Sequence, residues 1–193
     1  MKRLGNYFDS EYPFTEINHS RDIVRAVLFN EEWKIFIHHI LGDDIFGHRD
    51  YFETPGGGVE KGESLEEALK RECLEEVGYD VEVLSPIGEI IDYYNLIQRK
   101  NINYYFLARI QGDKKPVHHV SEGDKLISKT CVVSIEEAKQ LYLEKRNCPL
   151  GRLLFQREMP IFLETEKIMN SRILKVSSGF PKRGYFIGLN SVF

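Results

Sequence analysis

A glycine-containing loop that leads into an acidic helix, residues 57–79, restricts the fold of this 193-residue chain more than any other segment. Ser64 and Glu67 form a capping box, and Gly78 stands where a helix would end, so the pattern predicts a helix over residues 65–77. At 3.6 residues per turn, the apolar side chains of this helix fall on one stripe that must face a core. The stripe consists of Leu65, Ala68, Leu69, Cys73 and Val77.

Three carboxylates of this helix fall where an ordinary surface helix would not place them. Glu72 and Glu76 lie inside the apolar stripe and Glu75 projects from its edge, so all three converge on one patch. Burying isolated charges is costly, so these groups must be protonated, paired or bound to a cation. A divalent cation resolves the conflict, and oxygen ligands suit Mg²⁺, with Mn²⁺ as a substitute, rather than zinc. The alternative is that they are solvated or paired with Lys70 and Arg71.

The same segment resembles the Nudix box, in which a glycine, five residues, a glutamate and seven residues precede Arg-Glu-apolar-any-Glu-Glu-any-Gly-apolar. The fixed positions of the box are all matched, by Gly57, Glu63, Arg71, Glu72, Glu75, Glu76 and Gly78. Cys73 and Tyr79 fill the apolar positions, since an unpaired cysteine behaves as a small hydrophobe and tyrosine can bury its ring. Seven such matches would arise by chance in about one chain in a million of this size.

The resemblance implies a metal site and a reaction. Glu72 and Glu76 would be the principal Mg²⁺ ligands, and the backbone carbonyl of Gly56 would add another. Glu75 would bind a second metal ion or remove a proton from the attacking water. Arg71 and Glu63 would pair and orient the loop against the helix.

The resemblance also implies a further acidic residue in a loop before a late strand, which serves as a base or as an additional ligand. Glu122 occupies a matching place, and Asp124 is close enough to compete with it. Contacts to the substrate are expected from Arg25, Gly57 and Tyr93.

The rest of the sequence predicts a mixed β-sheet flanked by helices, an α/β or α+β sandwich. Strands are expected over residues 22–30, 33–40, 81–95, 101–110 and 125–135, the first two as a hairpin. A capping box at Ser134 predicts a helix to about Lys145, and Pro149 is placed to begin a third helix that Pro160 should end or kink. This order is similar to the Nudix fold over roughly residues 20–145.

Three segments are expected along the chain. Residues 1–20 lack periodicity and are interpreted as an irregular N-terminal arm that packs through Tyr7, Tyr12 and Phe14. Residues 21–170 would form the hydrolase domain. Residues 171–193 would form a turn-rich C-terminal tail of unclear role, with one strand-like run over residues 185–189.

Composition restricts the kinds of partner and the cellular location that can be expected for this chain. The formal net charge of -4 argues against general nucleic-acid binding, which needs a basic surface. No apolar run reaches the roughly 18–20 residues that span a bilayer, so no membrane association is expected. The three cysteines, Cys73, Cys131 and Cys148, form no CxxC pair, which favours reduced thiols and a cytoplasmic location.

The sequence therefore predicts a Mg²⁺-dependent hydrolase that cleaves the pyrophosphate bond of a small nucleotide. That substrate would be a nucleoside triphosphate, ADP-ribose, a nucleotide sugar or a dinucleoside polyphosphate. The alternative is a nucleotide-sensing regulator of the same fold without catalysis. Such regulators usually need an added DNA-binding domain, and the segment after residue 146 is short and not basic enough for one. A homodimer is also allowed, because the arm and the C-terminal run could cover edge strands.

Overall fold

The computed structural model describes residues 1–118, 120 and 123–177. Seven strands form one mixed sheet, in which the order is β1-β5-β6-β2-β3-β4 and β7 also pairs with β3. The strands are β1 (Arg3–Phe8), β2 (His19–Phe29), β3 (Ile35–Asp44), β4 (Gly47–Glu53), β5 (Asp80–Tyr94), β6 (Arg99–Gln111) and β7 (Ile127–Val133). The helices are α1 (Leu65–Val77), α2 (Ile135–Glu144) and α3 (Gly151–Ser177), with a short 3₁₀ turn, η1 (Asp124–Leu126).

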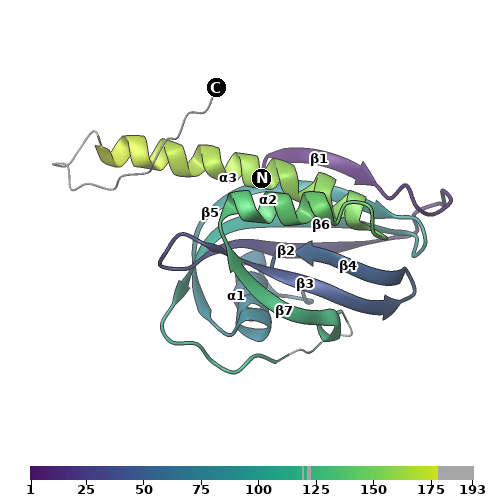
Figure 1. The fold of residues 1–193 in the computed structure, drawn as a ribbon, viewed down its shortest axis with the longest axis horizontal. Coiled ribbons are helices and arrows are strands. Elements are labelled where there is room, and N and C mark those ends of the chain that lie inside the picture. The colour runs from purple at the N-terminus through teal and green to yellow at the C-terminus, as the bar shows by residue number, and fades with distance from the viewer. Residues whose placement is uncertain (119, 121–122, 178–193) are drawn as a thin grey trace.

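The sheet has two wings. β1 runs parallel to β5 and β2 runs parallel to β6, whereas β5 and β6 are antiparallel. β3 is antiparallel to both β4 and β7. The two wings are joined where β2 meets β3 through the pair Phe29 and Ile35. The predicted mixed sheet flanked by helices is confirmed (Figure 1).

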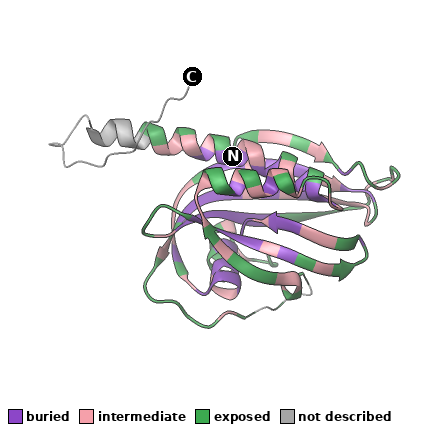
Figure 2. Cartoon of the chain, in the orientation of Figure 1, coloured by how far each residue is buried: buried purple, intermediate pink, exposed green. Residues whose placement is uncertain are grey.

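Helices cover both faces of the sheet. α1 lies on one face, and α2 and α3 lie on the other (Figure 1). One core forms beneath α1 and includes Val24, Leu69 and Cys73; the other includes Tyr105 from β6 and Phe162 from α3. Figure 2 shows that buried positions concentrate on the strands and on the inner sides of the helices. The described part of the chain contains no helix both long and apolar enough to span a membrane.

The local signals around α1 predicted its bounds correctly. Ser64 Oγ accepts a hydrogen bond from the backbone N–H of Glu67, and the Glu67 side chain accepts one from Ser64 N–H. Gly78 ends the helix with φ of 81°, a left-handed conformation that favours glycine. The hairpin of β2 and β3 is also confirmed, although β3 begins at Ile35 because Trp33 lies in the turn with φ of 60°.

The prediction of an irregular arm over residues 1–20 is wrong for its first part. Residues 3–8 form β1, which extends the sheet beside β5. β1 is an edge strand with exposed and half-buried side chains, so it carries no apolar alternation that the sequence could reveal. Phe14, expected to pack on the domain, is 81% exposed.

α3 does not end at Pro160, as one form of the prediction had it, but continues to Ser177. Proline removes one backbone donor from a helix. Packing offsets that loss, because Leu153 and Leu154 before the proline and Ile161 and Phe162 after it are all buried in the same core. The first residues of the predicted tail, 171–177, therefore belong to α3, whereas the strand-like run over residues 185–189 lies outside the described residues.

Candidate active site

α1 presents its carboxylates at the edge of the core, as its sequence pattern predicts. The apolar stripe of the helix packs against β2 and β5. Glu72 and Glu76 share that buried side and are only 7% and 5% exposed. Glu75 lies at the edge, with a quarter of its side chain exposed. The three predicted metal ligands therefore lie on one side of a single helix, at the boundary between the core and the solvent.

Arg71 is the cation that pairs with two of these carboxylates, those of Glu72 and Glu75. Its Nη1 donates to Glu72 Oε1 at 2.8 Å and to Glu75 Oε2 at 3.3 Å. Nε and Nη2 donate to the two carboxylate oxygens of Glu63 at 2.9 and 3.0 Å, so the expected pair is present and is bidentate. Nη2 also donates to the carbonyl of Gly58 at 2.9 Å, so one guanidinium ties the glycine loop to the helix.

The crowding of acids perturbs Glu72. Burial raises the pKa of Glu72 to about 7, the hydrogen bond from Arg71 opposes that shift, and the nearby charges of Glu76 and Glu75 add to it. Near neutral pH this carboxyl therefore holds a proton for part of the time. Three glutamates, Glu63, Glu72 and Glu75, share the single positive charge of Arg71.

The loop before the helix approaches the acids with its backbone. The N–H of Gly56 donates to Glu76 Oε2 at 2.7 Å. Gly56 has φ of 140°, and a Cβ there would collide with the carbonyl oxygen of Val24. A Cβ on Gly57 would lie 2.5 Å from Glu72 Oε1. Glycine at both positions lets the backbone reach the carboxylates.

Replacing Gly56 by alanine is expected to lower the free energy of unfolding by about 2 kcal/mol, because the new Cβ meets backbone and the left-handed φ is strained. Denaturant unfolding of the purified variant measures this. Gly47→Ala is the matched control, since Gly47 also has a positive φ but has open space around its Cβ position. Equal losses for the two variants would contradict the collision with Val24.

His38 on β3 is a neighbour of the acids that the sequence reading missed. It is 2% exposed, and its Nε2 lies 3.3 Å from Glu76 Oε2. Its Nδ1 lies 3.0 Å from Thr130 Oγ1 on β7. Among the described residues, Nε2 has no partner with good hydrogen-bond geometry. The available signal was alternation along β3, which puts His38 on the same side as Phe36, in the core beneath α1.

The donor set suits a hard divalent cation. The side chains that α1 offers as metal ligands have carboxylate oxygens. Burial and the nearby charges of Glu76 and Glu75 raise the pKa of Glu72 more than Arg71 lowers it. In the described part of the chain, no three ligating side chains converge closely on one point. Arg71 lies between Glu72 and Glu75 instead, so a cation would take over part of its role.

The other predicted site residues are not gathered here. Arg25 is buried and donates to Glu53, to the Thr54 carbonyl and to Asn103, which favours a structural role over substrate contact. Tyr93 stacks on Phe8, with ring centroids 4.3 Å apart, at the β1 side of the sheet. Its contacts are therefore with the outer strands rather than with α1.

The predicted base, Glu122, lies outside the described residues. Its competitor Asp124 begins η1, and Oδ2 of Asp124 accepts a hydrogen bond from the N–H of Val120 at 3.0 Å. The segment before this loop contacts the C-terminal end of α1. The N–H of His118 donates to the carbonyl of Glu75 at 2.8 Å, and the N–H of Lys115 donates to the carbonyl of Gly78 at 2.7 Å.

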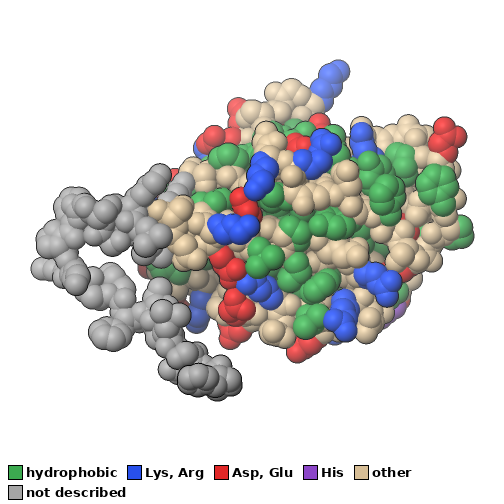
Figure 3. Space-filling model, turned by 90° about the horizontal axis from the view of Figure 1, so that it is seen from above, with side chains coloured by type: hydrophobic (Ala, Val, Ile, Leu, Met, Phe, Trp, Pro, Cys, Tyr) green, Lys and Arg blue, Asp and Glu red, His purple; other side chains and the backbone are tan. Residues whose placement is uncertain are grey.

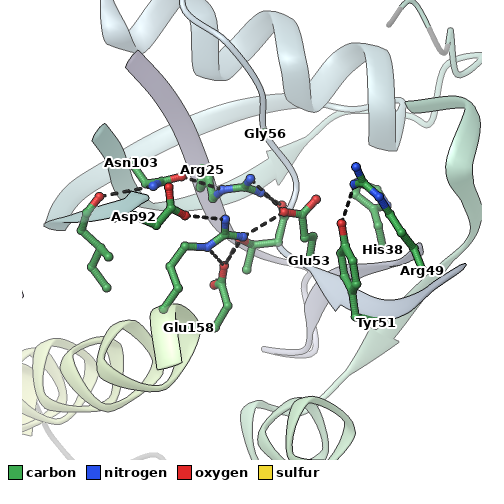
Figure 4. A network of polar contacts seen from close by, with 12 residues as sticks. Arg25, His38, Arg49, Tyr51, Glu53, Gly56, Asp92, Asn103 and Glu158 are labelled. Atoms are coloured by element: carbon green, nitrogen blue, oxygen red, sulfur yellow. Dashed lines mark hydrogen bonds and ion pairs between the residues drawn. The ribbon is translucent and has the colours of Figure 1, made fainter. Parts of the chain in front are cut away.

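A second polar cluster lies between the sheet and α3, and sequence reasoning missed it. Figure 4 shows Arg25, Glu53, Asp92 and Glu158 pointing toward one another. Arg157 of α3 joins them and has none of its side chain exposed. The missed signal is the spacing in α3, where Arg157 and Glu158 occupy positions between Leu153, Leu154 and Ile161, Phe162 on the buried stripe.

Comparisons with known proteins find similar sequences and similar folds. The model of the NUDIX domain matches residues 19–153. An RNA pyrophosphohydrolase of Wolbachia pipientis subsp. Culex pipiens is 46% identical over 77 residues, which cover 39% of this chain and 44% of that protein. The chain thus spans less than half of the length of this curated relative.

Solved structures share the fold at low identity. A NUDIX hydrolase from Nitrosomonas europaea has a TM-score of 0.56 at 19% identity, covering 76% of this chain and 88% of that one. A MutT protein from Methanosarcina mazei Go1 has a TM-score of 0.55 at 21% identity, covering 78% and 95%. These likenesses establish the architecture in which the acidic helix is set.

Proposed function

This chain belongs to the NUDIX family, whose domain model matches residues 19–153, and from that membership we propose that it is a metal-dependent hydrolase of a pyrophosphate bond. The observation that carries the proposal is the set of three glutamates on α1. Arg71 pairs with Glu72 and Glu75, and the glycine loop donates a hydrogen bond to Glu76. The substrate we propose is a nucleoside diphosphate linked to another group.

Glu72 and Glu76 would be the principal Mg²⁺ ligands, with Glu75 and the Gly56 carbonyl completing the set and Mn²⁺ able to substitute. When bound, Mg²⁺ would offset the charge of the phosphate oxygens, acidify a bound water and stabilise the leaving phosphate. Glu72 would give up its proton on binding, because a cation beside the carboxylate favours the ionised form that burial disfavours. The N–H of Gly56 would keep Glu76 oriented.

Glu75 is the base that we propose among the described residues, because it is the most exposed of the three acids and can reach water. Glu122 is the rival. Arg71 would act as a positioning residue, because its contacts are with Glu63, Glu72, Glu75 and the Gly58 carbonyl.

The name of the Wolbachia relative favours a second candidate substrate, a pyrophosphate group carried by RNA. Charge suggests how such a substrate would be held, since the net charge of the chain is -4. Figure 3 shows acidic and basic side chains interspersed on the face that carries α2 and α3, away from α1. An RNA would therefore be recognised locally at its pyrophosphate group rather than along its phosphate backbone.

The test is a panel of substrates incubated with the purified protein. It contains nucleoside triphosphates, ADP-ribose, nucleotide sugars, dinucleoside polyphosphates and a short 5′-triphosphorylated RNA, each with Mg²⁺, with Mn²⁺ or with EDTA. Cleavage at a pyrophosphate bond that EDTA stops is expected for at least one member. Products resolved by chromatography identify the substrate class.

The panel also separates the enzyme from the sensing alternative. Nucleotide binding without turnover in either metal would favour a regulator that senses a nucleotide. Turnover that persists in EDTA would contradict the metal role of the α1 glutamates, because hydrolysis would then proceed without a divalent cation.

A further inference from the structure

Arg157 is a fully buried cation whose three side-chain nitrogens are all engaged. Nη2 donates to Glu53 Oε1 at 2.9 Å, and Nη1 donates to Asp92 Oδ2 at 3.1 Å. Nε donates to Glu158 Oε1 at 3.0 Å, and the same oxygen accepts from the Tyr105 hydroxyl at 2.8 Å. α3 thus places one guanidinium among three carboxylates from separate parts of the chain.

This cluster forms hydrogen bonds with the last residue of β4 and with the residue that follows it. Glu53 Oε1 accepts from Arg157 and also from Arg25, at 3.0 Å. The next residue, Thr54, is held twice, because its carbonyl accepts from Arg25 Nη1 at 3.0 Å and its hydroxyl donates to Glu158 Oε2 at 3.3 Å. The side chain of Glu53 and both the backbone and the side chain of Thr54 are therefore fixed.

Glu53 and Thr54 lead directly into the loop that contacts the acidic helix α1. Pro55 follows Thr54, and its carbonyl accepts from Ala26 N–H at 2.9 Å. Gly56 comes next and donates to Glu76 Oε2 at 2.7 Å. The path from Arg157 to Glu76 thus runs through Glu53 and only three further residues of chain.

The ion pairs of Glu53 with Arg25 and Arg157 keep Glu53 ionised. Burial alone would raise the pKa of Glu53, but Arg25 and Arg157 outweigh it and lower that pKa to about 2. Glu53 therefore stays ionised at every pH at which the protein would work, and so do both arginines. A buried ionic cluster of this kind gives little net stability but fixes the positions of its members.

We propose that Arg157 is a positioning residue for the metal-binding loop. Arg157 acts by holding Glu53, while its neighbour Glu158 holds Thr54. Together these contacts set the position of Gly56 relative to Glu76. This inference rests on the proposed function, since it assumes that Gly56 and Glu76 bind the metal. It also gives a role in the site to α3, most of which lies beyond residues 19–153, where the family model matches.

The main test compares Arg157→Met with Arg152→Met, an exposed arginine on the same helix. Mn²⁺ binding to the protein without substrate, followed by electron paramagnetic resonance, reports the metal site directly. Arg157→Met is expected to weaken Mn²⁺ binding by about tenfold or more, as loss of an outer partner of a metal site commonly does. Arg152→Met should bind Mn²⁺ like the unmodified protein.

A double-mutant cycle tests the route of the effect. If Arg157 acts through Glu53, Glu53→Gln should weaken Mn²⁺ binding by itself, and the double variant should be little worse than either single one. Arg157→Lys, which keeps the charge but not the three-way fork, should recover part of the affinity. Independent, additive losses would overturn the proposal.

Folding is monitored by thermal unfolding of every variant. If Arg157→Met does not fold, Glu53→Gln and Arg157→Lys decide the matter, and unchanged Mn²⁺ affinity in both would overturn the inference. If the unmodified protein binds no Mn²⁺ and hydrolyses nothing, the proposed function fails instead. If it binds and hydrolyses normally and a folded Arg157→Met does the same, only the role of Arg157 is refuted.

Discussion

Replacing Glu76 with glutamine is expected to lower kcat by about a thousandfold, which corresponds to about 4 kcal/mol of transition-state stabilisation. Glu76 is the least exposed of the three acids, so a water molecule cannot easily take the place of its carboxylate as a metal ligand. The fold should survive, because the amide oxygen of glutamine can still accept the hydrogen bond from Gly56 N–H. Steady-state kinetics on the substrate identified by the panel measures the effect.

Glu66→Gln is the matched control for this experiment. Glu66 lies on the same helix, where its exposed side chain pairs with Lys70. The same change of charge there should leave kcat within about twofold, because an exposed ion pair contributes little. A Glu76→Gln variant with unchanged turnover would show that this carboxylate holds no catalytic metal.

Removing the carboxylate of Glu72 is expected to stabilise the metal-free protein at alkaline pH. The folded state raises the pKa of Glu72 from 4.5 to about 7, mainly by burial. The unfolded chain therefore loses its proton first as pH rises, and the native state loses stability between about pH 4.5 and 7. Above that window the unmodified protein should be about 3 kcal/mol less stable than Glu72→Gln, whereas below pH 4 the two should be alike.

Thermal unfolding in EDTA at pH 4 and at pH 8 measures this difference, which should raise the unfolding midpoint of the variant by roughly 5–10 °C at pH 8. Added Mg²⁺ should reverse the order, because it binds the native state only where the carboxylate is present. Glu66→Gln provides the reference for a surface charge. An alkaline midpoint for Glu72→Gln at or below that of the unmodified protein would contradict the crowding of the acids.

The features that the sequence predicted are those with local causes. α1 could be bounded because its caps lie within four residues of its ends, and the placement of Glu72, Glu75 and Glu76 along one side of the helix follows from helical periodicity alone. The pair of Arg71 with Glu63 came from the resemblance to the Nudix box and is present. The hairpin of β2 and β3 follows from two apolar runs and a short turn.

The features that the sequence could not supply have causes far away along the chain. β1 is ordered by its register with β5, more than eighty residues later, and not by any pattern of its own. Arg25 looked available for substrate because nothing nearby in the sequence indicates Glu53 or Asn103 as its partners. His38 meets Glu76 only after β3 and α1 pack together.

The cluster around Arg157 has a consequence for the order in which the protein becomes complete during synthesis. Glu53 and Arg157 are 104 residues apart in sequence, as are Thr54 and Glu158. During synthesis the glycine loop and the whole of α1 therefore leave the ribosome long before α3, the helix that contacts the residues before this loop, has been made. A nascent chain can build its acidic helix early from local signals, but the loop beside it acquires its final anchor only when α3 docks.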